Sequence, residues 1–302
     1  MALDVDLLRL LRAVNEEGSI SAAARRLGVS QPAASQQLRR AERRLGTALV
    51  ERNGRTSRLT EPGRVLARHA VAVDNLLQAA ESEVMAVAGL AAGTVRLVAF
   101  PSASARLVPR ALAALRLSHP GLRVSLAEVE PPGSLELLRQ GRADVVVTFD
   151  HVVPGQSWPP DRDGLLAVPL LADEVRLVLP SSGPWGDGAP VTLAGLADQD
   201  WIAGCPRCRG HLVDLAAAAG FAPRIRYETD DHVAVLGLVR EGLGVALLPS
   251  LAEADAPVAG VRTVSLSPPA RRQVLGVTTP DLARVPSVAA VLDALRVTAA
   301  AV

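Results

Sequence analysis

The sequence contains no lysine, so its 32 basic residues are all arginine, and aromatic side chains make up only 2% of its 302 residues. Only two cysteines are present, which argues against a secreted scaffold held together by disulfides. The hydrophobic fraction is nevertheless 49%, enough for a chain that folds and buries a large core. That core must consist mainly of alanine, valine and leucine, spread over two or three domains.

Long apolar runs are absent too. No stretch of about 18 residues is free of both charges and helix breakers, so a transmembrane helix is not expected. The first residues, MALDVD, contain no basic segment, and the sequence after them does not have the pattern of a signal peptide. These absences predict a cytoplasmic protein that has no membrane partner.

Motifs of common enzyme classes are missing as well. The chain has no G-x-S-x-G, no P-loop and no H-E-x-x-H, and its five histidines are scattered. We therefore expect neither an enzyme nor a bound cofactor. Charge is unevenly distributed, because residues 1–60 hold 11 arginines against 6 acidic residues, a net charge of +5. A basic N-terminal segment suits a polyanion as its partner.

This basic segment begins with the pattern of a helix-turn-helix. Leucines at helical spacing over residues 3–14 predict a helix that ends at Gly18. A second helix over 22–27 precedes Gly28, which suits a left-handed turn, and Ser30 can cap a third helix. Two helices joined by so short a turn form a helix-turn-helix.

The N-terminal side chains of the second helix of that motif enter the major groove of DNA. Glutamine can pair with adenine, proline can contact a thymine methyl group, and arginine can reach guanine or a phosphate. The residues predicted to face the DNA are Ser30, Gln31, Pro32, Ser35, Gln36 and Arg39. The alternative without a DNA partner is a three-helix bundle with a solvated basic face.

A basic hairpin follows the third helix. Asn53-Gly54 is a strong signal for a two-residue turn, and Arg52, Arg55 and Arg58 lie around it. The hairpin is expected to act as a wing that contacts phosphates or the minor groove. Because the cap, the glycine turn and this hairpin occur together and in order, they favour DNA binding over the simple bundle.

These motifs together resemble a known family. Residues 21–46, SAAARRLGVSQPAASQQLRRAERRLG, closely resemble the DNA-binding signature of LysR-type transcriptional regulators, and residues 59–63, LTEPG, resemble the start of the family's linker helix. In this family Gln31, Pro32, Ser35 and Gln36 would face the major groove. The resemblance extends over the whole chain and is strongest in residues 3–66. One departure is Val50, where the family usually has phenylalanine.

The resemblance implies an α+β multidomain architecture. A winged helix-turn-helix would occupy residues 1–60, a dimerising linker helix 61–91, and an effector-binding domain similar to periplasmic binding proteins 92–302. The effector domain would have two lobes, residues 92–172 with 269–302 and residues 173–268. The implied partners are double-stranded operator or promoter DNA, a small-molecule effector, RNA polymerase, and further copies of the chain in a homodimer or homotetramer.

The linker segment carries a heptad pattern. Its apolar residues are separated alternately by four and three positions, which is the a/d seam of a coiled coil. A long helix with such a seam needs a partner, either a second copy or the chain's own effector domain. The resemblance favours a second copy. The residues predicted to form the dimer contact are Leu66, Val73, Leu77 and Val84.

Strand and helix patterns alternate from residue 94 onward, and repeated βαβ units predict a mostly parallel sheet. Ligands of such sheets bind beyond the carboxyl ends of the strands, often at helix N-termini. Applied to this chain, the rule selects as effector-binding candidates Pro101, Ser102, Ser104, Glu130, Phe149, Asp150, Gly204, Cys205, Thr229 and Asp230. The resemblance singles out Ser102, since family members often hold an effector through a hydroxyl there.

Two alternatives stay open at this cleft. Ser102 and Ser104 can instead simply cap the helix over residues 105–118. The carboxylates make the cleft acidic and favour an amine or a neutral ligand, unless Arg106 and Arg207 reach the same place.

The two cysteines, Cys205 and Cys208, form a C-x-x-C, and His211 continues the spacing. The pair can line the cleft or pack structurally. It can also act as a redox switch, because a thiol near a helix N-terminus and an arginine tends to have a lowered pKa. As a metal site, the two cysteines and His211 would form an incomplete set of ligands, since no second ligand pair lies nearby in the sequence. By resemblance, peroxide-sensing members of the family use cysteines in this lobe, with wider spacing.

Overall fold

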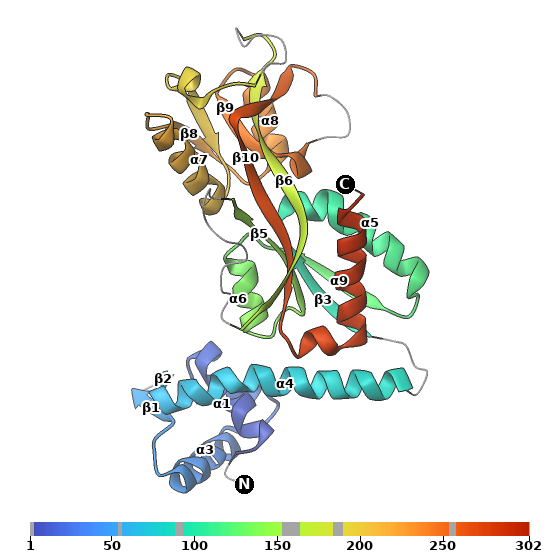
Figure 1. Ribbon diagram of the computed structural model, residues 1–302. Helices are drawn as coiled ribbons and strands as arrows, with labels where there is room; N and C mark the ends of the chain where they lie inside the picture. Colours follow the sequence, from blue (N-terminus) through green and yellow to red (C-terminus); the bar gives the residue numbers. More distant parts are fainter. Residues whose placement is uncertain are drawn as a thin grey trace. The chain divides into compact units, whose positions relative to one another are not determined.

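The computed structural model describes residues 3–53, 56–87, 93–152, 164–183, 190–253 and 258–301. The chain divides into two compact units. The first consists of the N-terminal helices, a hairpin and a long helix, and the second is built on one large β-sheet (Figure 1).

Three helices and their connections form the N-terminal domain, as the sequence predicts. They are α1 (Val5–Glu17), α2 (Ile20–Arg26) and α3 (Gln31–Leu45). Gly18 ends α1 and Gly28 forms the turn before α3, with φ angles of +67° and +69° that favour glycine.

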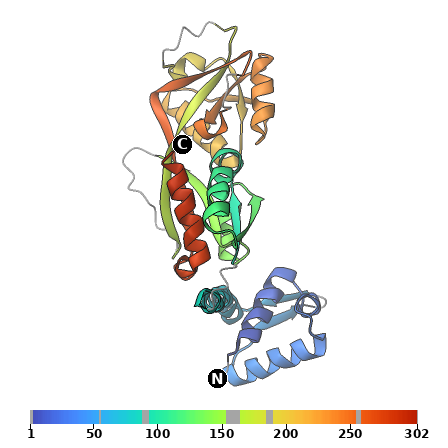
Figure 2. The ribbon, with the colours of Figure 1, turned by 90° about the vertical axis from the view of Figure 1, so that its right-hand side faces the viewer.

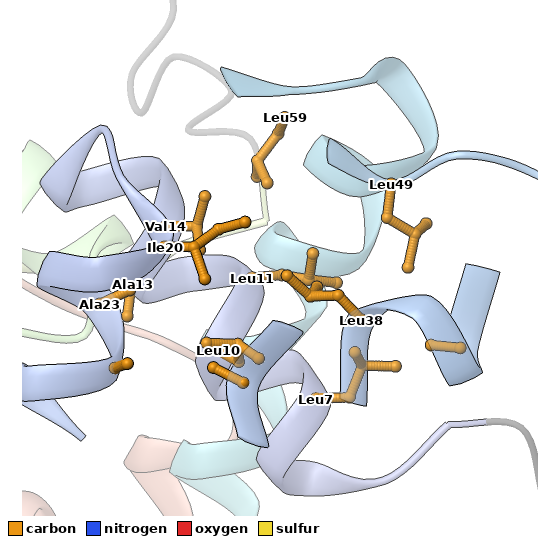
Figure 3. Packing of buried hydrophobic residues seen from close by; sticks show 13 residues of the cluster. Leu7, Leu10, Leu11, Ala13, Val14, Ile20, Ala23, Leu38, Leu49 and Leu59 are labelled. Carbon is orange, nitrogen blue, oxygen red and sulfur yellow. The ribbon is translucent and has the colours of Figure 1, made fainter. Parts of the chain in front are cut away.

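Leucine, alanine, valine and isoleucine side chains from all three helices meet in one core (Figure 3). Leu7, Leu10, Leu11 and Val14 supply the face of α1, and Leu38 supplies the centre of α3. Leu49, just before the hairpin, and Leu59, the last residue of its second strand, close the core. The helical spacing of the leucines therefore predicts this core correctly.

The predicted hairpin is present as β1 (Val50–Asn53) and β2 (Thr56–Leu59), which pair antiparallel. A carboxylate of α3 fixes its start, because Glu42 Oε1 accepts hydrogen bonds from the backbone N–H of Leu49 at 2.9 Å and of Val50 at 3.3 Å. The Ser57 N–H donates to the Gly18 carbonyl at 2.8 Å. The hairpin is thus held against both α1 and α3. Its tip, residues 54 and 55, lies outside the described residues.

A single long helix, α4 (Glu61–Val87), follows the hairpin. At its start Leu66 and Ala67 pack on the core of the N-terminal domain. Further along, Leu76 and Leu77 are 50% and 41% exposed, and Val84 is 67% exposed. The seam therefore has two parts: Leu66 serves the domain's own core, and the second half of the helix leaves large apolar side chains uncovered.

The C-terminal domain is built on one eight-stranded sheet of order β4-β3-β5-β10-β6-β9-β7-β8. Its strands are β3 (Thr94–Ala99), β4 (Arg123–Glu128), β5 (Val145–His151), β6 (Leu166–Pro180), β7 (Asp200–Ala203), β8 (Arg224–Glu228), β9 (Val245–Pro249) and β10 (Val261–Thr278). The first three strands in that order are parallel to one another, as are the last three.

Two long strands, β6 and β10, join the parallel halves and run antiparallel to each other and to their outer neighbours (Figure 1). The prediction of a mostly parallel sheet is therefore only partly right, because the sheet is mixed. We call the half with β3, β4 and β5 lobe one and the half with β7, β8 and β9 lobe two. The domain is thus two-lobed, and both lobes share β6 and β10.

The helices of lobe one are α5 (Pro101–Ser118), α6 (Gly133–Arg139) and α9 (Pro286–Ala299), and those of lobe two are α7 (Pro206–Ala218) and α8 (His232–Arg240). Helices α5 and α9 lie side by side (Figure 2). Short 3-10 turns complete the domain: η1 (Leu193–Leu196), η2 (Ser250–Ala252) and η3 (Leu282–Arg284). Within the described residues, no helix is long and apolar enough to cross a membrane.

Candidate functional site

The first turns of α3 present most of the predicted DNA-facing side chains to solvent. Exposed residues in this set are Ser30, Gln31, Pro32, Gln36 and Arg39. Ser30 is the N-cap, and its hydroxyl accepts a hydrogen bond from the Ala33 N–H at 3.3 Å. The cap fixes where the helix begins and therefore which side chains lie in its first turn.

Ser35 differs from this prediction. It is only 3% exposed, and its hydroxyl accepts a hydrogen bond from Gln31 Nε2 at 2.9 Å. The physical reason is its position beside Ala34 and one turn before Leu38, at the edge of the buried face of α3. The prediction that Ser35 faces outward is therefore wrong; its contact orients Gln31 instead.

Exposed arginines extend along the same helix and onto the hairpin. Arg39, Arg40, Arg43 and Arg44 of α3 and Arg58 of β2 are all exposed. Such an array suits a phosphate backbone. The predicted Arg55 lies outside the described residues, as does the side chain of Arg52.

Residues of both lobes line two of the pockets in the C-terminal domain. The larger of these two has a volume of about 560 Å³, within the usual range for small-molecule sites. It lies between the first turns of α5 in lobe one and of α8 and η2 in lobe two. Its lining is Pro101, Ala105, Arg106, Glu128, Asp230, Asp231, His232, Val233, Leu251, Ala252 and Glu253. We call it the outer pocket.

The smaller pocket, which we call the inner pocket, has a volume of only about 30 Å³. It brings together six of the predicted effector residues, from both lobes: Ser102, Glu130, Gly204, Cys205, Thr229 and Asp230. Asp230 and His232 line both pockets. Most of the predicted residues therefore do converge on one place.

Of the other predicted effector residues, Pro101 lines only the outer pocket, and three line neither pocket. Phe149 is completely buried, and its ring packs edge-on against Phe100 with centroids 4.9 Å apart. Asp150 forms an ion pair with Arg207 Nη2 at 2.8 Å, and Arg207 also donates to the Phe149 carbonyl. These residues therefore hold β5 to α7 and do not line either pocket.

The third predicted residue outside both pockets is Ser104. The alternative prediction, that Ser104 caps helix α5, is wrong as well. Helix α5 begins at Pro101, earlier than predicted, and its N-cap Phe100 has no side chain able to cap it. Ser102 and Ser104 thus lie inside the first turns. Among the described residues, the buried Ser104 hydroxyl has no hydrogen-bond partner.

A buried arginine that no sequence motif indicates organises the inner pocket. Arg272 of β10 is 2% exposed, and its guanidinium donates to Asp173 Oδ2 at 2.8 Å and to the Ser102 hydroxyl at 2.7 Å. It also lies over the rings of Phe100 and Phe149, 4.7 and 4.4 Å from their centroids. The hydroxyl of Ser102 is therefore already engaged.

Cys205 is the N-cap of α7, and its Sγ lies 3.1 Å from Cys208 Sγ. The Cys208 N–H donates to Cys205 Sγ at 3.4 Å. The hydrogen bond with the Cys208 thiol, together with backbone N–H donors, lowers the Cys205 pKa despite burial. The same thiol contact and burial raise the pKa of Cys208.

Glu130, which follows β4, lines the inner pocket beside Cys205 and Asp230. Burial, reinforced by the negative charges of Cys205 and Asp230, raises its pKa to about 8. Glu130 is therefore largely protonated at neutral pH, and its Oε2 has no hydrogen-bond partner among the described residues.

His211 does not join the cysteines in a metal site. Its ring stacks on that of His151, with centroids 3.8 Å apart and planes within 11°. Among the described residues, no three His, Cys, Asp or Glu side chains are arranged to hold a metal ion. The stack connects β5 of lobe one to α7 of lobe two.

Acid is expected to destabilise the C-terminal domain through this stack. Burial, followed by the charges of His211, Arg272 and Arg207, lowers the His151 pKa to about 2. The unfolded chain binds a proton at His151 near pH 6.5, and the folded domain does not. The contribution of His151 to the free energy of unfolding is therefore fully present above that pH. Below it, the free energy of unfolding falls by about 1.4 kcal/mol per pH unit because of this one group.

Urea unfolding between pH 7 and pH 5 measures this loss. His151→Phe keeps an aromatic partner for His211 and is expected to reduce the pH slope by the contribution of one proton. His119→Gln, a change at an exposed histidine of the same domain, should keep the parent slope. An unchanged slope in His151→Phe would contradict the assignment.

Two family descriptions match the chain. Residues 5–64 match "Bacterial regulatory helix-turn-helix protein, lysR family", and residues 88–300 match "LysR substrate binding domain". A curated relative from Synechococcus elongatus, a probable HTH-type transcriptional regulator LrrA, is 31% identical over 98% of each chain.

Solved structures share the fold. A variant of full-length OxyR from Pseudomonas aeruginosa aligns with a TM-score of 0.71 and 20% identity, over 97% of this chain and 95% of that one. Full-length CbnR, solved in a complex with target DNA, aligns with a TM-score of 0.60 and 23% identity, over 98% of this chain and all of that one.

Proposed function

The chain belongs to the LysR family of transcriptional regulators, and we propose that it reads operator DNA with the first turns of α3 under the control of a small molecule bound between its lobes. The observation that carries the DNA-reading role is the exposure of Gln31, Pro32, Gln36 and Arg39 at the start of a capped helix. In a helix-turn-helix this is the surface that enters the major groove.

Within this surface, Gln31 is the residue best prepared to recognise a base. Its amide is exposed, and its contact with the buried Ser35 hydroxyl limits the directions in which it can point. A glutamine amide can pair with both hydrogen-bonding groups of adenine. The arginines of α3 and Arg58 would contact phosphates and contribute affinity without sequence choice.

Gln31→Ala is therefore expected to relax sequence choice more than it weakens total binding. A lost base contact costs about 1–3 kcal/mol, roughly a tenfold to hundredfold fall in the ratio of operator to nonspecific affinity. Fluorescence anisotropy with operator and scrambled duplexes at fixed salt measures this ratio.

Gln37→Ala is the matched control, because Gln37 lies in the same helix but its amide donates to Asp4 Oδ1 at 3.3 Å. The control should keep the parent ratio. Equal loss of affinity for both duplexes in Gln31→Ala would contradict the role of Gln31 in reading bases.

For the effector we propose the outer pocket. Its wall carries four carboxylates, those of Glu128, Asp230, Asp231 and Glu253, against the guanidinium of Arg106. Glu253 is already paired with Arg176 at 3.2 Å, so the other three carboxylates supply the excess of negative charge. This balance favours a small cationic ligand such as an amine. Because both lobes contribute to the wall, a bound ligand would shift the populations of their arrangements.

A thermal-shift screen of amines against carboxylates of matched size tests this assignment. Stabilisation by carboxylates alone would contradict it.

We propose that the second half of α4 joins two copies of the chain. Leu77 and Val84, seven residues apart on the predicted seam, are exposed there, as is the neighbouring Leu76, and such a helix needs a partner. A dimer, or a tetramer of two dimers, would place helix-turn-helix domains on paired half-sites. We also propose that the protein acts on RNA polymerase, that it is located in the cytoplasm and that it is not an enzyme.

A further inference from the structure

We propose that Cys205 and Cys208 form a reversible thiol–disulfide switch in the wall of the inner pocket, oxidised by a small hydroperoxide, with Glu130 of lobe one as the proton carrier. The chemistry stands independently of the DNA-reading role. Its regulatory consequence rests on the proposed function.

The two sulfur atoms are already in contact. Their separation of 3.1 Å exceeds the roughly 2.05 Å of a disulfide by about 1 Å, so a small movement of the first turn of α7 suffices to form the bond. Cys205 is the N-cap of this 13-residue helix and Cys208 lies in its first turn. A C-x-x-C at a helix N-terminus is an arrangement that favours dithiol chemistry.

The surroundings give the two thiols different roles. Cys205 Sγ accepts a hydrogen bond from the backbone N–H of Cys208 at 3.4 Å and lies 3.1 Å from the Cys208 thiol. When Cys205 ionises, its thiolate accepts the proton of that thiol as well, and both contacts stabilise it. These contacts lower the pKa of Cys205, while the same thiol contact and burial raise the pKa of Cys208, so Cys205 is the thiol that ionises more readily. Since the thiolate is the nucleophile, Cys205 attacks first and Cys208 resolves.

Glu130 brings the proton that the reaction needs. It enters the inner pocket from the end of β4, facing the cysteines of lobe two. Because burial and the neighbouring negative charges raise its pKa to about 8, it is mostly a carboxylic acid when Cys205 is a thiolate. A proton donor and a nucleophile therefore line one small space.

The steps balance as follows. The Cys205 thiolate attacks one oxygen of the hydroperoxide and breaks the O–O bond, which forms a sulfenic acid and releases an alcohol or water that takes its proton from Glu130. The Cys208 sulfur then attacks the Cys205 sulfur and displaces hydroxide. The carboxylate of Glu130 carries the Cys208 proton to that hydroxide, so water leaves, and a solvent proton restores Glu130. An external thiol reverses the reaction.

The size of the inner pocket selects the oxidant. Its volume of about 30 Å³ holds one or two water-sized molecules, and Cys205 is only 2% exposed. Hydrogen peroxide fits this space. Cumene hydroperoxide and glutathione disulfide do not, so they are expected to oxidise Cys205 much more slowly.

Oxidation would act on the contact between the lobes. Arg207 lies between the two cysteines and holds α7 to β5 through Asp150 and the Phe149 carbonyl. Drawing Cys208 toward Cys205 changes the turn that carries this arginine. The expected result is a different balance between arrangements of the lobes.

The test treats reduced full-length protein, without DNA, with hydrogen peroxide and follows its mass and free thiols. The parent should lose both thiols within one chain and recover them with dithiothreitol. Cys208→Ser should instead stop at a sulfenic acid that dimedone traps on Cys205. In Cys205→Ser, the remaining thiol should be oxidised at least about tenfold more slowly than the thiols of the parent. Thiols that persist in the parent, or disulfides found only between chains, would overturn the proposal.

Two further variants separate the roles. Glu130→Gln should slow disulfide formation and remove the step near pH 8 from the pH–rate profile of that reaction. Glu128→Gln, a change in the outer pocket, should keep the parent profile. An unchanged profile in Glu130→Gln would overturn the role of Glu130. Gln31→Ala should be oxidised at the parent rate, so a failure of the DNA-reading proposal would show in the DNA assay and leave this result unaffected.

Discussion

Gly63→Ala is expected to unfold the N-terminal domain, or to leave it too unstable to bind DNA, while the C-terminal domain stays folded. A β-carbon at this position of α4 would lie 2.1 Å from the Leu49 carbonyl oxygen and 3.3 Å from the Leu59 β-carbon. The obstacle is backbone, and the same carbonyl accepts the Thr60 N–H at 3.0 Å. Neither side can move without breaking the junction between the hairpin and α4.

Overpacking of this kind costs about 1–3 kcal/mol, and more where the obstacle cannot relax, which is a large share of the roughly 5–15 kcal/mol by which a domain is stable. Urea unfolding followed by circular dichroism, together with anisotropy on operator DNA, measures both consequences. Gly210→Ala is the control, because Gly210 lies in α7 with open space around its would-be β-carbon and should gain up to about 1 kcal/mol. Parent-like stability in Gly63→Ala would contradict the packing described at this junction.

Arg272→Met is the second change with a large expected effect, this time on the C-terminal domain. Asp173 is 1% exposed and would lose the cation that neutralises it, 2.7 Å away. The carboxylate also accepts hydrogen bonds from the Ser250 hydroxyl at 2.6 Å and the Leu251 N–H at 3.1 Å, so it cannot turn to solvent. Leaving such a charge unpaired costs about 3–5 kcal/mol.

Chemical unfolding of the full chain measures this loss, and two variants interpret it. Arg176→Met removes a half-exposed arginine paired with Glu174 and Glu253 and should cost no more than about 1 kcal/mol. In the double variant Arg272→Met with Asp173→Asn, part of the stability should return, because the buried charge is gone. A loss in Arg272→Met no larger than in Arg176→Met would contradict the account of this pair.

The N-terminal domain was predictable from the sequence because its signals are local. Leucine spacing, Gly18 and Gly28 at turns, and the cap Ser30 each act within a few residues, and each has the predicted role. Ser35 was not predictable in the same way, since it lies at the margin of the buried face. Whether a residue at the edge of an apolar helix face is buried depends on how the neighbouring helices pack, which spacing in the sequence does not show.

The C-terminal domain was predicted less completely because its organisation depends on long-range pairing. The alternating pattern predicts parallel strands, but only parts of β6 and β10 have the sequence pattern of a strand. Their remaining parts are half-buried and include Pro169, Pro268 and Pro269, which are unfavourable signals for a strand. Only pairing between the two strands extends them to their full lengths.

The candidate pocket shows the same limit. Positions at the ends of strands predicted six of the residues that line the inner pocket. They gave no indication of Arg272, because an arginine in a strand usually faces solvent. The one available signal was Asp173, a carboxylate within the apolar stretch LAVPLLADEVRLVLP, which needs a buried cation if it points inward.

The most direct test of the regulator assignment is footprinting of the full-length protein on the region upstream of its own gene and the neighbouring divergent gene. Sequence-specific reading by a dimer predicts protection of a defined inverted repeat whose half-sites lie on one face of the DNA helix, about one or a few turns apart. It also predicts that an excess of unrelated duplex does not remove this protection. Uniform protection without a boundary, or none at low salt, would contradict sequence-specific reading by α3.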